Sequence, residues 1–274
     1  MLVRSLNPLA FAALGIFCLA LKPDPLDLAP SPHRMEGLPA RTLWVWERPE
    51  DLRALDTRTT AIATLDRTIV VGRAAIVIPR RQPVVYPAGI TRIAVVRIEA
   101  PGTIAKGMER RTAGLILDSV GDRGMDSRGG VPIAALQIDF DARKSQRGFY
   151  AAVLRDLRRR MPSDMPLSIT ALASWCSSDD WIASLPVDEA VPMFFRMEPD
   201  RRYAPPGLPQ LRIREPLCMG SVGISTHEPA PDDMAGKRVY IFPDRGWRED
   251  LPPLARTGSQ TRQQDTTKNE RTQQ

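Results

Sequence analysis

Short apolar runs recur along the middle of the chain, and each has about the length of a β-strand. Several of them alternate apolar and polar residues, as expected for a strand whose two faces have different surroundings. Turn-forming residues separate the runs, so each run is interpreted as one strand. The eight expected strands are residues 43–46, 60–65, 92–98, 134–140, 167–175, 190–195, 221–226 and 238–242.

Helical spacing of apolar residues lies between several of these strands, at residues 49–55, 104–120 and 145–161. In the last segment Phe149, Val153 and Leu157 fall on one helical face, with arginines on the other. Strands that alternate with helices are typical of a parallel sheet. Eight repeats of this kind predict a closed (β/α)8 TIM-like barrel.

The predicted barrel is irregular in two places. Between the second and third strands there is no helical pattern, and residues 74–87 read AAIVIPRRQPVVYP, with two β-like runs around Pro79 and Pro83. We expect a β-hairpin inserted after the second strand, at the C-terminal rim of the barrel, where functional insertions accumulate. The crossings that follow the sixth and seventh strands are short or interrupted by proline.

Both ends of the chain differ in character from its middle. Arg4 precedes an apolar run at residues 9–20, which is short for a membrane span and ends in a small-x-small pattern typical of signal peptides. We therefore expect an exported protein, either periplasmic or anchored to the inner membrane by its N-terminal segment. The expected organisation is a signal peptide or N-terminal anchor at 1–22, a proline-rich linker at 23–40, a single barrel domain at 41–252 and a disordered polar tail at 253–274.

Two carboxylates end the fourth expected strand, in the stretch LQIDFDA. Because strand side chains alternate, Gln137, Asp139 and Asp141 share one face, which would point into the barrel. The third strand repeats this design with Arg97 and Glu99. All five residues would approach the C-terminal mouth, where barrel enzymes build their active sites.

Further polar and aromatic residues close other strands at the same rim. Carboxylates that share a site with aromatic rings suit a saccharide, because rings stack on sugars and carboxyl groups cleave glycosidic bonds. For Trp44, Trp46 and Trp181 a place in the core is favoured. The expected catalytic residues are Asp139, Asp141, Glu99 and Glu228, and the expected substrate-binding residues are Arg97, Gln137, Trp175 and Glu47.

Several alternatives remain open at this point. Asp139, Asp141 and Arg97 can instead form a structural ion-pair network, and the aspartates can serve as hard oxygen ligands of a metal-dependent enzyme. His227 ends a strand, where a histidine is more often hydrogen-bonded locally. Cys176 and Cys218 can form a disulfide or remain separate buried thiols.

Composition narrows the range of partners. The chain has a net charge of +6 and an isoelectric point near 9.6, but its basic residues are spread out, with one tight cluster at 158–160. That cluster ends an expected helix, where cations favour the helix dipole and the solvent, so nucleic acid is not an expected partner. There is no CxxC motif and there are only 2 histidines, so we expect neither a zinc site nor a cofactor.

Four segments carry a resemblance to a known family: LWVWERPEDLR (43–53), LQIDFDARKSQRGFY (136–150), LSITALASWC (167–176) and LPVDEAVPMFFRM (185–197). Together they resemble an uncharacterised bacterial family known as domain of unknown function 3142, over most of residues 40–250. The family brings no established activity.

More distantly, the fourth strand is similar to the Asp-x-Asp-x-Glu strand of chitinase-like glycosidase barrels. Asp139 and Asp141 match the two aspartates, but Arg143 stands where those enzymes carry their catalytic glutamate. Any proton donor would then come from Glu99, Glu228 or an aspartate. The sequence therefore leaves two functions open: an exported glycosidase-like enzyme that acts on an envelope or extracellular saccharide, and a non-catalytic carbohydrate-binding or envelope-assembly protein on a degenerate glycosidase barrel.

Overall fold

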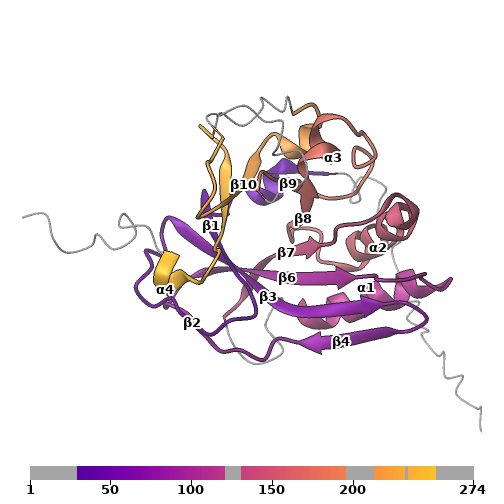
Figure 1. Cartoon of the computed structure of the whole chain (residues 1–274), viewed down its shortest axis with the longest axis horizontal. Coiled ribbons are helices and arrows are strands. Elements are labelled where there is room, and N and C mark those ends of the chain that lie inside the picture. The colour runs from indigo at the N-terminus through magenta and orange to yellow at the C-terminus, as the bar shows by residue number, and fades with distance from the viewer. Residues whose placement is uncertain (1–29, 121–130, 196–212, 232–233, 251–274) are drawn as a thin grey trace, which may run out of the picture.

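Eight parallel strands close into a barrel in a computed structural model that describes residues 30–120, 131–195, 213–231 and 234–250 (Figure 1). The order around the barrel is β1-β11-β10-β9-β8-β7-β6-β3, and pairing of β3 with β1 closes it. This confirms the predicted (β/α)8 TIM-like barrel. The strands are β1 (Arg41–Val45), β3 (Thr60–Val71), β6 (Thr91–Glu99), β7 (Ile133–Asp139), β8 (Leu167–Leu172), β9 (Glu189–Met193), β10 (Ser221–Ser225) and β11 (Arg238–Phe242).

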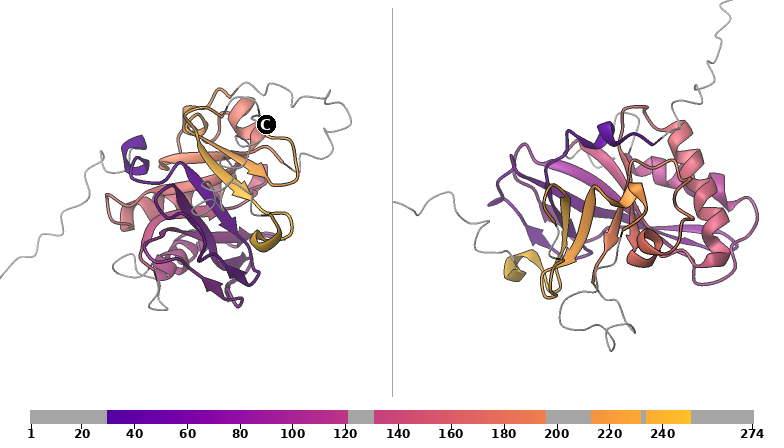
Figure 2. Two further views of the ribbon diagram at one scale, coloured as in Figure 1. Left: turned by 90° about the vertical axis from the view of Figure 1, so that its left-hand side faces the viewer. Right: turned by 90° about the horizontal axis from the view of Figure 1, so that it is seen from above.

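Two long helices cover one side of the barrel. They are α1 (Met108–Val120) and α2 (Arg147–Arg160), which pack together on the outer face of the neighbouring strands. Leu136 and Ile138 of β7 point outward into this layer and share a core with Val153 and Leu157 of α2. Figure 2 shows both long helices on one side, with β10 and β11 away from them.

The crossings on the remaining side contain only short elements among the described residues. They are the helix α3 (Ala173–Ser177) and the 3-10 turn η5 (Pro216–Cys218). The short helix α4 (Trp247–Asp250) follows the last strand and contacts β2. Cys176 of α3 and Cys218 of η5 form a disulfide whose Cα atoms lie 5.9 Å apart, which settles the open question about these cysteines. The bond joins two crossings that have no long described helix, and closing a loop of 42 residues contributes about 4 kcal/mol in the chain-entropy model.

Two predicted elements are wrong. Residues 49–55 do not form a helix, because the amides of Glu50 and Leu52 donate to the carbonyls of Pro83 and Val85, which makes a two-stranded sheet of β2 (Glu50–Asp51) and β5 (Val84–Val85). The strand expected at 167–175 ends at Leu172, and the chain then turns into α3.

A β-hairpin follows the second barrel strand as predicted, but the two expected runs do not pair with each other: β4 (Ala75–Pro79) pairs with the end of β3, and β5 pairs with β2. β4 runs antiparallel to the last five residues of β3, from Arg67 to Val71. β3 is therefore longer than the expected 60–65. Arg80 then donates to the backbone carbonyls of Trp46 and Arg48, which fixes the loop after β4 against the end of β1.

The last part of the expected linker packs under the barrel. The 3-10 turn η2 (Pro32–Met35) and the residues after it bury Met35 and Leu38 in the cluster that fills the barrel interior. Arg34 lies 2.7 Å from Asp188, the residue before β9. The described chain thus begins by closing the N-terminal end of the barrel, while the expected signal peptide or anchor and the polar tail fall outside the described residues.

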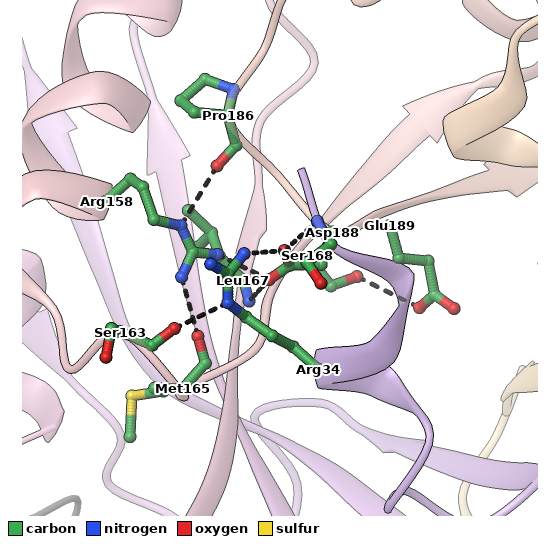
Figure 3. Close-up of polar contacts among 10 residues, drawn as sticks. Arg34, Arg158, Ser163, Met165, Leu167, Ser168, Pro186, Asp188 and Glu189 are labelled. Atoms are coloured by element: carbon green, nitrogen blue, oxygen red, sulfur yellow. Dashed lines mark hydrogen bonds and ion pairs between the residues drawn. The ribbon is translucent and has the colours of Figure 1, made fainter. Parts of the chain in front are cut away.

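Asp188 is bound on both of its carboxylate oxygens (Figure 3). Oδ1 accepts from Arg34 and from the amide of Ser31 (2.7 and 3.0 Å), and Oδ2 accepts from Arg158 and from the amide of Leu167 (2.6 and 2.8 Å). The Arg158 and Asp188 side chains are both fully buried, and burial lowers the pKa of Arg158. Arg158 therefore does not meet solvent at the helix end, as the sequence had indicated.

A second buried carboxylate occupies the barrel interior one residue later. Glu189 accepts from Arg238 at 2.6 Å and from the hydroxyl of Tyr240 at 2.7 Å, and Ser168 lies 3.4 Å away. Burial is the main cause that raises the pKa of Glu189, and Arg238 opposes it. The interior charge is thus matched by donors from β8 and β11.

We predict that Arg158→Leu lowers the free energy of unfolding by about 3–5 kcal/mol, because it removes one partner of a fully buried ion pair. The neighbouring Arg159 pairs with Asp156 at 2.9 Å but is half exposed, so Arg159→Leu is the matched control, with an expected loss below about 1 kcal/mol. Urea unfolding of both variants measures the difference. Equal losses would mean that the Asp188 contacts do not hold the fold.

Candidate functional site

The charged centre of the barrel mouth is an ion pair between neighbouring strands. Arg97 near the end of β6 and Asp139 at the end of β7 are paired in register, and Arg97 Nη1 lies 2.7 Å from Asp139 Oδ2. The hydroxyl of Thr170 on β8 donates to Asp139 Oδ1, also at 2.7 Å. Asp139 is buried and its two oxygens have different donors, so its position is fixed from both sides.

Asp141 lies two residues beyond Asp139 and has a different environment. The residue is exposed at the mouth, and no hydrogen bond or ion pair to its carboxylate is found within the described part of the chain. Removal of water by the surrounding wall raises the pKa of Asp141, the negative charge of Asp139 raises it further, and Arg97 opposes both effects. The two aspartates at the end of β7 are therefore chemically unequal.

Two expected site glutamates are already engaged. Glu99 accepts a hydrogen bond from Arg97 Nε at 3.1 Å and remains about half exposed. Burial lowers the pKa of Arg97. The charges and hydrogen bonds of Asp139 and Glu99 have the opposite effect and outweigh burial, so the pKa of Arg97 is raised overall. Glu47 Oε1 accepts from the backbone amides of Arg81 and Gln82, both at 2.8 Å, so Glu47 fixes the inserted loop at the rim.

An aromatic cluster lies at the mouth, at the ends of β1, β9 and β11. Trp46 follows β1 and Phe242 ends β11, and their ring centroids lie 6.4 Å apart; Phe195, after β9, lies 4.7 Å from Phe242. Trp44 forms the buried floor, stacked on Phe242 at 5.0 Å. β11 is four strands from β7 in either direction around the eight-stranded barrel, so Phe242 lies across the barrel from β7, whereas Trp46 follows β1, three strands from β7, and Phe195 follows β9, two strands from β7.

A glycine on β10 makes room for this cluster. A Cβ atom at Gly223 would lie 3.2 Å from Phe242 Cε2 and 3.3 Å from the carbonyl oxygen of Pro192. Both distances are shorter than ordinary carbon contacts, so a larger residue would displace the Phe242 ring.

Three expected site residues lie elsewhere. Gln137 is fully buried inside the barrel, where it accepts from Trp44 Nε1 at 2.7 Å and donates to Ser168 at 3.1 Å, so it belongs to the core. Trp175 is 3% exposed and packs against Trp181 in the outer core, because α3 begins before it and ends the strand alternation. Glu228 follows β10, three strands from β7, on a different part of the rim from the aspartates.

Sequence reasoning missed several residues of the mouth. Thr170 alternates with Ser168 on the inner face of β8, and Phe242 is the last residue of the eighth strand, so both had a signal in their positions. Trp46 was placed in the core, whereas its ring is only partly buried. Arg143, at the position of the chitinase glutamate, is exposed at the start of the 3-10 turn η3 (Lys144–Gln146), where its amide donates to Gln146.

A cavity of about 510 Å³ lies at the opposite, N-terminal end of the barrel, between η2, η5 and the starts of β9 and β11. Its most buried charged groups, Asp188 and Glu189, already pair with arginines. Across the described ranges, no three His, Cys, Asp or Glu side chains come together to hold a metal ion. No helix within those ranges has both the length and the apolar character to span a membrane.

Comparison with known proteins identifies one family over the part of the chain that carries the charged site. The family described as "Domain of unknown function (DUF3142)" matches residues 88–195, a shorter span than the resemblance over 40–250 indicated. This span runs from the approach to β6 through the end of β9, so it includes Arg97, Asp139, Asp141 and Thr170. No curated protein matches the chain. The chain is thus similar to the family of domain of unknown function 3142 over residues 88–195.

Proposed function

We propose that the protein cleaves a glycosidic bond of a saccharide bound in the barrel mouth, with Asp141 as the proton donor and Asp139 as its ionised partner. The observation that carries this proposal is the unequal environment of the two aspartates that end β7. Asp139 is held by the guanidinium of Arg97 and the hydroxyl of Thr170, whereas Asp141 is exposed and has a raised pKa. Such a division between neighbouring carboxyl groups is how many enzymes separate acid and anion roles.

The chemistry of glycosidic bond cleavage requires this division of roles. A protonated acid must meet the leaving oxygen, and a carboxylate near the anomeric carbon stabilises the positive charge that develops there. Asp141 is the group whose protonated form is favoured by its surroundings. Asp139 is fixed by Arg97 and Thr170, so it can present a carboxylate with little reorganisation. Glu99, which accepts a hydrogen bond from Arg97 beside Asp139, is the carboxylate placed to act as a water-activating base.

The aromatic cluster of the mouth supports a saccharide as the ligand. Trp46 and Phe195 are partly exposed, and they follow β1 and β9 at the same mouth as the aspartates. Aromatic faces bind the C–H faces of sugar rings, while Arg97 and the carboxylates can hydrogen-bond hydroxyl groups. A ligand with one apolar face and many hydroxyl groups therefore fits both the aromatic and the charged residues of the mouth.

Export is part of the proposal, because disulfides persist mainly in oxidising compartments and Cys176 pairs with Cys218. The N-terminal run acts as a signal peptide or as an inner-membrane anchor, and an envelope or extracellular saccharide would then be the available substrate.

The second candidate is a carbohydrate-binding or envelope-assembly protein without catalytic activity. Arg143 favours it, because a cation stands where chitinase-like barrels carry their acid. The binding surface would be the same, and only the role of Asp141 would differ.

Incubation of the full chain with a panel of bacterial polysaccharides tests this proposal through the release of new reducing ends. We expect Asp141→Asn to lower kcat/KM by about 10²–10⁴-fold, the usual range for loss of a general acid, and Asp139→Asn to abolish turnover as well. Asp118→Asn, on the exposed surface of α1, is the control and should retain full activity. Binding without release of reducing ends, lost in both mouth variants, would establish the non-catalytic function instead.

The pH dependence of kcat/KM tests the assignment of the acid. Because Asp141 must be protonated to donate, activity should fall as pH rises through its pKa, and the raised pKa shifts this basic limb to higher pH than an ordinary aspartate would give. Asp141→Glu keeps a carboxylic acid and should keep a basic limb. A limb that persists in Asp141→Asn would assign the proton donor to another residue.

A further inference from the structure

The wall of the mouth continues past the barrel as an open sheet. β3 and β6 extend beyond the closed part, and β4 adds an antiparallel strand at their edge (Figure 1). Residues paired in register point their side chains to the same face of a sheet. Arg97 pairs with Thr68, and Thr68 pairs with Ile78, so the row that begins at Asp139 runs across four strands. The next row joins Glu99, Val70 and Ile76.

The opposite face of this sheet is covered, which fixes the direction of these rows. Ile69 is fully buried in the core under α1, and Val77 packs against that core. Arg67 donates to the carbonyl of Leu115 in α1. Alternation therefore directs Thr68, Val70, Ile76 and Ile78 to the face that carries Arg97 and Glu99.

The outer part of this face is apolar and open to solvent. Ile76 is 60% exposed and Ile78 is 44% exposed, and Val70 and Thr68 are partly exposed beside them. We define these four residues as the apolar ledge. Leu172, at the end of β8 beyond Thr170, adds another side chain that is 39% exposed. The apolar side chains of β3 and β4 thus lie one and two strands from Arg97 and Glu99, on the same face of the sheet.

We propose that the apolar ledge binds a hydrocarbon chain attached to the saccharide, so that the ligand of the mouth is an acylated or lipid-linked sugar. This inference rests on the proposed function and names the class of its ligand. The rows place charged and hydroxyl-binding groups at Asp139, Arg97 and Glu99, and apolar groups one and two strands farther out. A ligand with a polar head and an apolar chain would place its head against these charged residues and its chain on the apolar ledge.

Continuity with the charged site favours this occupant over a second copy of the chain. Edge strands bind other strands through their free backbone groups, but β4 has only five residues and ends in Pro79, which has no amide hydrogen to donate. The exposed isoleucines lie on the face of the sheet, not along its edge, and that face continues to Arg97.

Methyl NMR of isoleucine-labelled full chain tests the proposal with n-octyl, n-decyl and n-dodecyl glucosides and maltosides below their micelle concentrations. We expect the methyl signals of Ile76 and Ile78 to shift, and the affinity to rise with chain length by up to about fourfold for each CH2 that is fully buried. The double variant Ile76→Thr/Ile78→Thr, which keeps β-branched residues in the strand, should lose this dependence on chain length. Val85→Thr, an exposed residue of β5 away from the ledge, is the matched control and should keep it.

Three outcomes would overturn the proposal: no shift at Ile76 and Ile78 with any alkyl glycoside, an unchanged dependence on chain length in the double variant, or a wild-type dimer by sedimentation that the double variant loses. The dimer would assign the ledge to self-association. Failure here leaves the reducing-end assay with unacylated polysaccharides unaffected. Conversely, equal shifts of the ledge signals by alkyl glycosides in wild type, Asp141→Asn and Trp46→Ala would mean that the mouth does not bind the sugar. That result would contradict the saccharide function and leave a hydrocarbon site.

Discussion

The fold depends most on one buried carboxylate, Asp188, at the N-terminal end of the barrel. Its four donors come from the segment before β1, from the end of α2 and from the start of β8, so one side chain joins three distant parts of the chain. This matters because the crossings after β8 and β9 have no long helix among the described residues to cover the barrel. The nearby disulfide joins those same two crossings. Buried charge and a covalent bond thus support the side that helix packing does not.

Charge is distributed unevenly along the barrel axis. At the N-terminal end and in the interior, Asp188 and Glu189 have partners for both of their oxygens. At the mouth, Asp139 is satisfied by Arg97 and Thr170, whereas Asp141 is exposed and the charge of Asp139 disfavours its ionised form. The completed pairs at one end stabilise the fold, and the proposed function assigns the acid role to Asp141 at the other end, whose carboxyl group has no such pair within the described ranges. The family match over residues 88–195 includes both aspartates of the mouth.

Strand alternation was enough to predict the barrel and the neighbourhood of Arg97 and Asp139, because a period of two directly gives the face of each side chain. It failed where the backbone leaves the strand. Trp175 was assigned to the mouth, but α3 begins at Ala173 and turns it into the core. Residues 49–55 have helical spacing, yet pairing with β5 makes β2. Arg158 was predicted to meet solvent at the end of its helix, but it pairs with Asp188, which lies 30 residues away in the sequence. A contact at this separation leaves no signal in the local pattern of residues.

The central claim is that the two aspartates of β7 differ in their protonation, with Asp141 as the acid. Carbon-13 NMR titration of the carboxyl groups in the intact protein tests this directly and needs no substrate. The account predicts that Asp141 titrates above the ordinary range of an aspartate, and that Asp139→Asn lowers its pKa by removing the neighbouring negative charge. An Asp141 carboxyl group that titrates at or below the ordinary range, and does not respond to Asp139→Asn, would contradict the account.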